Sequence, residues 1–341
     1  MEACGSGKLV VVNRLSKIGA DINITDKEGN TPFYWACSWG NIDIVNRLIE
    51  KGCDIHNTYT DRKTPLMEAC GRGKLTVGGN IDIVNLLIDK GCDVHTTNNN
   101  GQTPLMEACS VGHLLVVNRL IKKGADINTT DKGGNTPFIR SAFDGNIEIV
   151  NLLIRKGCDI HKRNNEGETP LMRAGGGGHL SVVKSLIEKG ADITLTDKEG
   201  NTPIYWSCTG GNIDIVNLLI AKGCDIHEMN NNGQTPLMGT CSHGHLSVVN
   251  CLIEKGADIT LTDKEGNTPI YWSCTGGNID IVNLLIAKGC DIHEMNNNGQ
   301  TPLMGACRLG HLSVVNRLIK DGVDINITDK NRNIYLVSIW W

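Results

Sequence analysis

The sequence has few aromatic residues, few prolines and no large excess of charge of either sign. Aromatic residues make up 4% of the 341 residues, nine residues are proline, and the formal net charge is -4. A nucleic-acid groove would need a strongly basic face, which 33 basic against 37 acidic residues do not favour. No apolar run approaches the roughly 20 residues that a membrane-spanning helix needs, so we expect neither nucleic acid nor a membrane as partner.

An export signal is also lacking, although cysteine is abundant. Residues 1–20 contain no compact apolar stretch after a basic start, so we expect no signal peptide. Fourteen cysteines in such a chain predict reduced, buried thiols and a cytoplasmic protein, with the nucleus as the alternative compartment.

Proline occurs in one context only. All nine prolines belong to the dipeptide Thr-Pro, whose threonines lie 33 residues apart in seven of the eight intervals and 39 apart in the other. Proline confined to one phase of a fixed period marks a recurring local structure. The threonines are at positions 31, 64, 103, 136, 169, 202, 235, 268 and 301.

Each period predicts two short helices and a loop. Thr31 can cap a helix whose first turn holds Pro32, and residues 33–39 supply about two turns before Gly40. Residues 41–51 then carry apolar side chains at helical spacing, and Gly52 ends this second helix. We expect its buried apolar stripe to comprise Ile42, Val45, Leu48 and Ile49. The polar stretch up to residue 61 predicts an extended turn or hairpin.

These motifs resemble the ankyrin repeat. The resemblance is carried by Thr103-Pro104-Leu105-Met106-Glu107-Ala108, then Gly112-His113-Leu114, then Gly124-Ala125-Asp126-Ile127-Asn128, and it covers nearly the whole chain. It implies an all-α repeat solenoid of stacked helix-turn-helix units with hairpin or loop fingers, about ten units in all, the first one truncated. The family's histidine after Thr-Pro-Leu is replaced by Met106, Met172 or Met304, or by Tyr34, Tyr205 or Tyr271.

We expect the array to span residues 1–333, followed by an atypical apolar tail at 334–341. Its units lie near 1–30, 31–63, 64–102, 103–135, 136–168, 169–201, 202–234, 235–267, 268–300 and 301–333. Two unit types alternate, and Asp192 to Gly239 is identical to Asp258 to Gly305, so the true period is 66 residues. Unit 64–102 has a six-residue insertion that reads as two fused units, with a predicted loop over Gly71 to Gly79.

Cysteine and histidine recur in a pattern that a zinc site could use. Tetrahedral zinc needs four converging ligands, whereas these Cys-x-x-His pairs mostly recur two units apart, roughly 20 Å in stacked helices. The cysteine also replaces the small alanine of the family's Gly-Ala-Asp. We therefore expect core packing, and neither metal nor cofactor. The pairs are Cys53/His56, Cys92/His95, Cys158/His161, Cys224/His227 and Cys290/His293.

A further histidine series opens second helices and alternates there with asparagine. The histidines of this series are His113, His179, His245 and His311, and the other unit type carries Asn146, Asn212 and Asn278 at the same position. This exchange predicts a turn or capping role rather than catalysis. No carboxylate pair or nucleophile triad occurs outside the repeated scaffold, so we expect no enzyme.

Positions that vary between units predict the binding residues. In ankyrin proteins the first helices and hairpin tips line a concave face that holds partners, and the resemblance implies the same face here. Variable positions on the first helices nominate the partner-binding residues, and Gly239 is expected to leave a gap between two of the tryptophans. The candidates are Trp35, Trp39, Glu68, Arg72, Glu107, Arg140, Arg173, Trp206, Trp272 and Arg308. The competing interpretation is that the tryptophans only pack along neighbouring first helices.

The sequence therefore predicts a non-catalytic, monomeric adaptor or scaffold that binds a protein. Met1 to Cys4 matches Met67 to Cys70, so the chain is expected to begin inside a first helix, and neither end has a polar capping unit. These ends motivate the alternative, an ankyrin part of a larger channel or signalling protein whose activity lies elsewhere.

Overall fold

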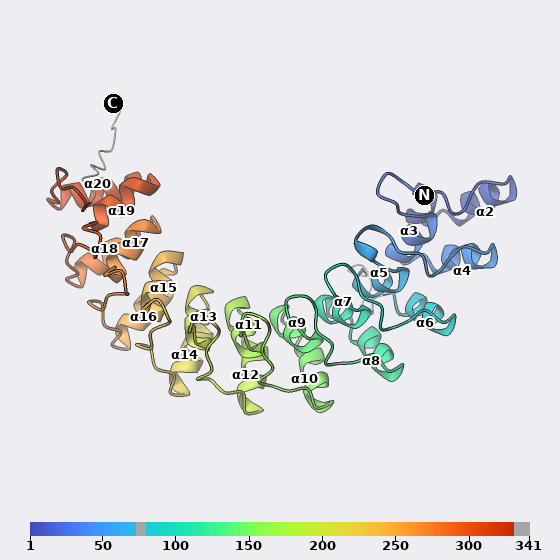
Figure 1. Ribbon diagram of the computed structural model, residues 1–341, viewed down its shortest axis with the longest axis horizontal. Coiled ribbons are helices and arrows are strands. Elements are labelled where there is room, and N and C mark those ends of the chain that lie inside the picture. Colours follow the sequence, from blue (N-terminus) through green and yellow to red (C-terminus); the bar gives the residue numbers. More distant parts are fainter. Residues whose placement is uncertain (73–79, 331–341) are drawn as a thin grey trace. The chain divides into compact units, whose positions relative to one another are not determined.

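The computed structural model describes residues 1–72 and 80–330 (Figure 1). Within these ranges the chain forms twenty α-helices, one 3-10 turn (Thr60–Arg62) and no strand. The first helices of the pairs are α1 Glu2–Gly5, α3 Pro32–Ser38, α5 Pro65–Gly71, α7 Pro104–Val111, α9 Pro137–Phe143, α11 Pro170–Gly177, α13 Pro203–Thr209, α15 Pro236–His243, α17 Pro269–Thr275 and α19 Pro302–Leu309.

The second helices are uniform, with nine residues each. None of the helices in the described ranges is both long and apolar enough to cross a membrane. They are α2 Leu9–Lys17, α4 Ile42–Glu50, α6 Ile81–Asp89, α8 Leu114–Lys122, α10 Ile147–Arg155, α12 Leu180–Glu188, α14 Ile213–Ala221, α16 Leu246–Glu254, α18 Ile279–Ala287 and α20 Leu312–Lys320.

The helices form two compact units, Met1–Glu166 and Gly167–Trp341. Within each unit a first helix packs against the first helix of the next pair, and second helices pack against second helices. This arrangement confirms the predicted repeat solenoid in each unit.

The Thr-Pro dipeptide starts the first helix, as predicted. At all nine sites the threonine hydroxyl accepts a hydrogen bond from the backbone N–H three residues later, at 3.2–3.4 Å. The proline occupies the first turn, where no N–H donor is needed. Such a cap contributes about 1 kcal/mol to helix stability, so the repeated dipeptide stabilises nine helices of only seven or eight residues.

The buried stripe of the second helix differs from the one predicted from the sequence. In α4, Ile44, Val45 and Leu48 are at most 2% exposed, while Ile42 and Ile49 are half-buried. Ile44 faces the core because it lies one turn before Leu48 on the same helix face.

The loops form fingers that are joined in series by backbone hydrogen bonds. In one finger, Asp131 N donates to Asn135 O at 3.1 Å and Gly134 N donates to Asp131 O at 2.9 Å. Lys132 N donates to Asn100 O of the preceding finger at 2.9 Å. The same connection links the fingers of the second unit, where Asn231 N donates to Glu199 O at 2.8 Å.

The asparagine or histidine before most second helices caps the first helix of the preceding pair. Asn146 Nδ2 donates to Cys109 O at 2.7 Å, and His245 Nε2 donates to Thr209 O at 2.9 Å. The predicted capping role is therefore confirmed, and the structure adds that the bond joins neighbouring pairs. His113 differs, because its buried Nε2 has no partner in the part of the chain that the structure describes.

The predicted loop over Gly71 to Gly79 lies almost wholly outside the described residues, as does the predicted apolar tail at 334–341. On either side of residues 73–79, α5 ends at Gly71 and α6 begins at Ile81. Asn80 donates to Cys37 O at 2.9 Å, so α6 is joined to the preceding pair in the ordinary way.

The finger before α5 has an unusual backbone. Arg62, with φ 57°, stands at the left-handed position that glycine fills in the other eight fingers, and Asp61 before it has φ 60°. A non-glycine residue in this conformation costs about 1–2 kcal/mol, because Cβ approaches the following carbonyl oxygen.

We expect Arg62→Gly to raise the free energy of unfolding by about 1 kcal/mol, because glycine removes the Cβ strain. Arg62→Ala is the matched control, since it removes the guanidinium but keeps Cβ. The measurement is the urea midpoint of each variant. An equal gain from alanine and glycine would show that the guanidinium, and not the backbone, is the source.

Candidate functional site

The structure divides the candidate residues into three groups. Trp39 is 57% exposed, and Arg72 and Arg308 are also exposed, near the ends of α3, α5 and α19. Glu68 is buried at 3% exposure, which differs from the solvent position expected for it. The half-buried group comprises Trp35, Glu107, Arg140, Arg173, Trp206 and Trp272.

The half-buried tryptophans are held by aspartates of their own fingers. The indole Nε1 donates to the aspartate Oδ2 at 3.0 Å in the pair Trp206–Asp197 and at 3.1 Å in Trp272–Asp263. Trp35 makes the same bond to Asp26 at 3.1 Å. Asp197 is 7% exposed and also accepts from the Asn201 backbone N–H at 2.8 Å. One carboxylate therefore fixes both the finger and the orientation of the indole.

Arginine takes the place of tryptophan in the unit that begins at Thr136. Arg140 Nε donates to Asp131 Oδ2 at 3.1 Å, so the guanidinium donates to the aspartate that is equivalent to the one bonded by the indole in the tryptophan units. Burial alone would raise the pKa of Asp131, but the bonds from Arg140 and Asn135 outweigh it and hold that pKa below its usual range. The sequence did not single out these aspartates, although the signal was present: aspartate alternates with asparagine in step with the helix residue.

The alternate units carry asparagine where these have aspartate. Asn230 Nδ2 donates to Asn201 Oδ1 of the preceding finger at 2.8 Å, and Asn296 repeats this bond to Asn267 at 2.7 Å. Tyr205, at the family's histidine position, donates its hydroxyl proton to Gln234 Oε1 of the next finger at 3.2 Å. The tyrosine hydroxyl therefore joins two units.

The predicted gap at Gly239 is wrong. A Cβ at Gly239 would lie 3.0 Å from both Tyr205 Cζ and Thr209 Cγ2, so the neighbouring helix already fills this space. At Gly305 a Cβ would lie 2.8 Å from Thr275 Cγ2. Glycine at these two positions lets α13 and α17 approach the next first helix closely.

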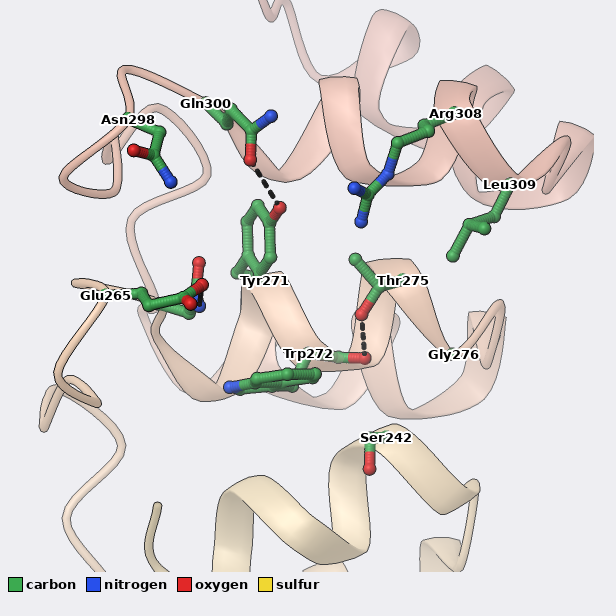
Figure 2. A pocket seen from close by; sticks show the side chains of 11 residues that line it. Ser242, Glu265, Tyr271, Trp272, Thr275, Gly276, Asn298, Gln300, Arg308 and Leu309 are labelled. Atoms are coloured by element: carbon green, nitrogen blue, oxygen red, sulfur yellow. Dashed lines mark hydrogen bonds between the residues drawn. The ribbon is translucent and has the colours of Figure 1, made fainter. Parts of the chain in front are cut away.

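A cavity of about 430 Å³ opens beside Trp272, between α17 and α19 (Figure 2). The rings of Trp272 and Tyr271 are perpendicular, with their centroids 6.3 Å apart, and Arg308 and Leu309 point from α19 toward α17. Glu265 lines the finger side of the cavity. Aromatic, acidic and basic groups thus meet at one opening of the second unit.

A more apolar cavity of about 540 Å³ lies beside Trp35 and Trp39 in the first unit. Met1 and Gly5 of the neighbouring segment line it, together with Asp26. The two candidate tryptophans of this unit therefore share one opening.

Glu68, Arg72 and Glu107 belong to one ionic network. Arg72 Nε lies 3.0 Å from Glu68 Oε2, and Lys63 Nζ lies 3.8 Å from Glu68 Oε1 and 3.3 Å from Glu107 Oε1. Two cations therefore compensate the buried Glu68 carboxylate, which explains why it tolerates burial. Arg173 likewise pairs with its own finger, through Glu168 at 3.3 Å.

The Cys-x-x-His pairs divide between core and solvent. Their thiols are buried or half-buried, whereas the histidines three residues later are exposed. Burial raises the pKa of all five thiols, to about 11 for Cys158 and about 12 for Cys224. Among the described residues, no group of three or more His, Cys, Asp or Glu side chains is placed to hold a metal.

We expect Trp272→Arg to leave stability nearly unchanged and Trp272→Phe to lower it by about 1–2 kcal/mol. Arginine can donate to Asp263 as Arg140 does to Asp131, whereas phenylalanine removes a hydrogen bond to a buried carboxylate. Urea midpoints of both variants provide the measurement. If phenylalanine is tolerated better than arginine, the indole contributes through packing alone.

Stoichiometric zinc should leave the melting temperature unchanged. The thiol must lose its proton to bind metal, which the raised pKa of each buried thiol opposes. Thermal denaturation with and without zinc tests this, with calcium as the control ion. A clear rise specific to zinc would contradict the packing role of these cysteines.

Comparison with known proteins places these features in one family. The family described as "Ankyrin repeats (3 copies)" matches residues 1–78, 75–164, 125–197, 171–263, 209–296 and 238–329. A search of the curated proteins gives no significant match. The matches together cover most of the chain, and the helix pairs and fingers agree with them. The chain therefore belongs to the ankyrin repeat family.

Proposed function

We propose that this chain is a non-catalytic adaptor or scaffold, and that it binds a protein partner on the face formed by its first helices and fingers. Ankyrin repeats are generally protein–protein interaction modules. The observation that carries the proposal is the set of half-exposed tryptophans, each held in one orientation by a finger aspartate. Tryptophan and arginine are also the residues most often found to dominate binding energy at interfaces.

Rigidity of these side chains favours binding. Immobilising a mobile side chain at an interface costs about 0.5–1.5 kcal/mol, and the indole–aspartate bond meets that cost before a partner arrives. The cavities beside Trp272 and between Trp35 and Trp39 add concave surface at the same helices. Both properties support recognition of a protein segment by this face.

We propose that a single copy acts in the cytoplasm or nucleus, without a cofactor. The fourteen cysteines, all free thiols, support a reducing compartment. The small net charge of -4 supports a protein rather than a nucleic acid as partner.

The double variant Trp206→Arg with Trp272→Arg tests the proposed face. Arginine keeps a donor for each finger aspartate, so we expect the fold to survive while partner capture from expressing cells falls at least about tenfold, or about 1.4 kcal/mol. Quantitative affinity purification measures capture, and circular dichroism measures folding.

The control variant is Lys184→Ala with Glu188→Ala, which changes exposed side chains of α12, a second helix. It should capture partners as the unmodified protein does. Loss of capture by this control, with capture retained by the tryptophan variant, would place binding on another face.

A further inference from the structure

The tryptophan units share a second acidic residue that the arginine unit lacks. Glu28, Glu199 and Glu265 each stand three residues before the threonine of a unit that carries Trp35, Trp206 or Trp272. In the unit with Arg140 the same position is Gly133. The residues around Trp35 differ from those around the other two tryptophans, yet the glutamate is present there as well.

These glutamates form no ion pair with a cationic side chain in the part of the chain that the structure describes. Glu265 Oε2 accepts only a long bond from Asn267 Nδ2, at 3.5 Å, and Glu199 and Glu28 accept the equivalent bonds at 3.4 and 3.3 Å. None of the three forms an ion pair with any described residue. Their negative charge is therefore available to a group from outside.

In the unit that contains Arg140, a cation of the chain itself balances the finger carboxylate. There, one guanidinium meets one carboxylate, Asp131, and the second carboxylate is absent. In a tryptophan unit the neutral indole satisfies the aspartate, and the glutamate adds a charge that no ion pair with a described residue compensates. Exchanging tryptophan for arginine thus coincides with loss of the glutamate.

We propose that each Trp–Glu pair is a binding site for a cationic side chain, arginine or lysine, of the protein partner. This inference rests on the proposed function and names the chemistry of its partner. An indole face attracts a cation through its quadrupole, and a neighbouring carboxylate strengthens the attraction. Glu265 and Trp272 line the same cavity of about 430 Å³, which provides the required space (Figure 2).

The two sites of the second unit are not equal. Their sequences are identical from Asp192 to Gly239 and from Asp258 to Gly305, but Arg308 lines the cavity at Trp272. Ser242 stands at the corresponding position after Trp206. The positive charge of Arg308 repels a second cation, so the site at Trp206 binds the cationic side chain more tightly than the site at Trp272.

The test uses a capped peptide of alternating glycine and arginine, titrated into the full chain with ¹⁵N-labelled indoles. Single Trp→Phe variants assign the Nε1–H signals. We expect the signals of Trp35, Trp206 and Trp272 to shift, with Trp206 saturating before Trp272. Peptides with citrulline or glutamate in place of arginine keep the backbone but remove or reverse the charge, and should bind at least about tenfold more weakly.

The variant Glu199→Gln with Glu265→Gln should weaken arginine-peptide binding about five- to tenfold at Trp206 and Trp272, while Trp35 responds as before. The matched control, Glu188→Gln with Glu254→Gln, changes two exposed glutamates of second helices and should have no effect. Equal binding of the citrulline or glutamate peptide, or an unaffected Glu199/Glu265 variant, would overturn the proposal.

Failure here is distinguishable from failure of the proposed function. The peptide titration does not use the natural partner. If no peptide shifts the indole signals but Trp206→Arg with Trp272→Arg still abolishes capture, the first helices and fingers bind the partner through other chemistry and the cation proposal is rejected.

Discussion

Contact with the next helix pair stabilises each pair of this chain. Helices of seven to nine residues are too short to be stable alone in water, because a nucleus must form before hydrogen bonds add up. Within each compact unit the first helices pack on first helices and the second on second. Residues such as Val45 and Leu120 are fully buried only because neighbours cover them. The Thr-Pro caps begin the first helices, and the asparagine or histidine before a second helix donates to a carbonyl near the end of the preceding first helix, which joins neighbouring pairs.

Hydrogen bonds between the fingers also make each unit depend on its neighbours. A finger aspartate such as Asp197 accepts from its own hairpin and from Trp206, and the next finger donates through Asn230 to Asn201. Aspartate and asparagine alternate because the two unit types need different hydrogen-bonding groups. The aspartate accepts a hydrogen bond from a side chain of the first helix, whereas the asparagine donates one to the neighbouring finger. The 66-residue period of the sequence is therefore the period of a hydrogen-bond pattern, not only a record of duplication.

Most of the fold could be predicted from the sequence, because the signals are local and repeated. Thr-Pro fixes where first helices start, and glycine marks helix ends. The candidate site was less predictable. Variation among repeats suggested that position 68 faces solvent, yet Glu68 is buried, because Lys63 and Arg72 compensate its charge. Similarly, Gly239 suggested an empty space, but Tyr205 of the preceding unit fills it. Both differences depend on neighbouring side chains whose contacts form only in the folded chain: two cations beside Glu68, and a tyrosine of the preceding unit beside Gly239.

Packing and recognition, which the sequence presents as competing roles for tryptophan, are compatible in this structure. The edge of the Trp272 indole is satisfied by Asp263, whereas part of the ring surface lines a cavity. A side chain that is bonded at its polar edge loses little freedom when its ring is covered, so the same bond that stabilises the finger prepares the ring for a partner. Arg140 meets the first requirement but not the second, since its guanidinium is already paired with Asp131. Under the proposed function, the choice between tryptophan and arginine at this position therefore separates units that bind an external group from units whose donors and acceptors are satisfied internally.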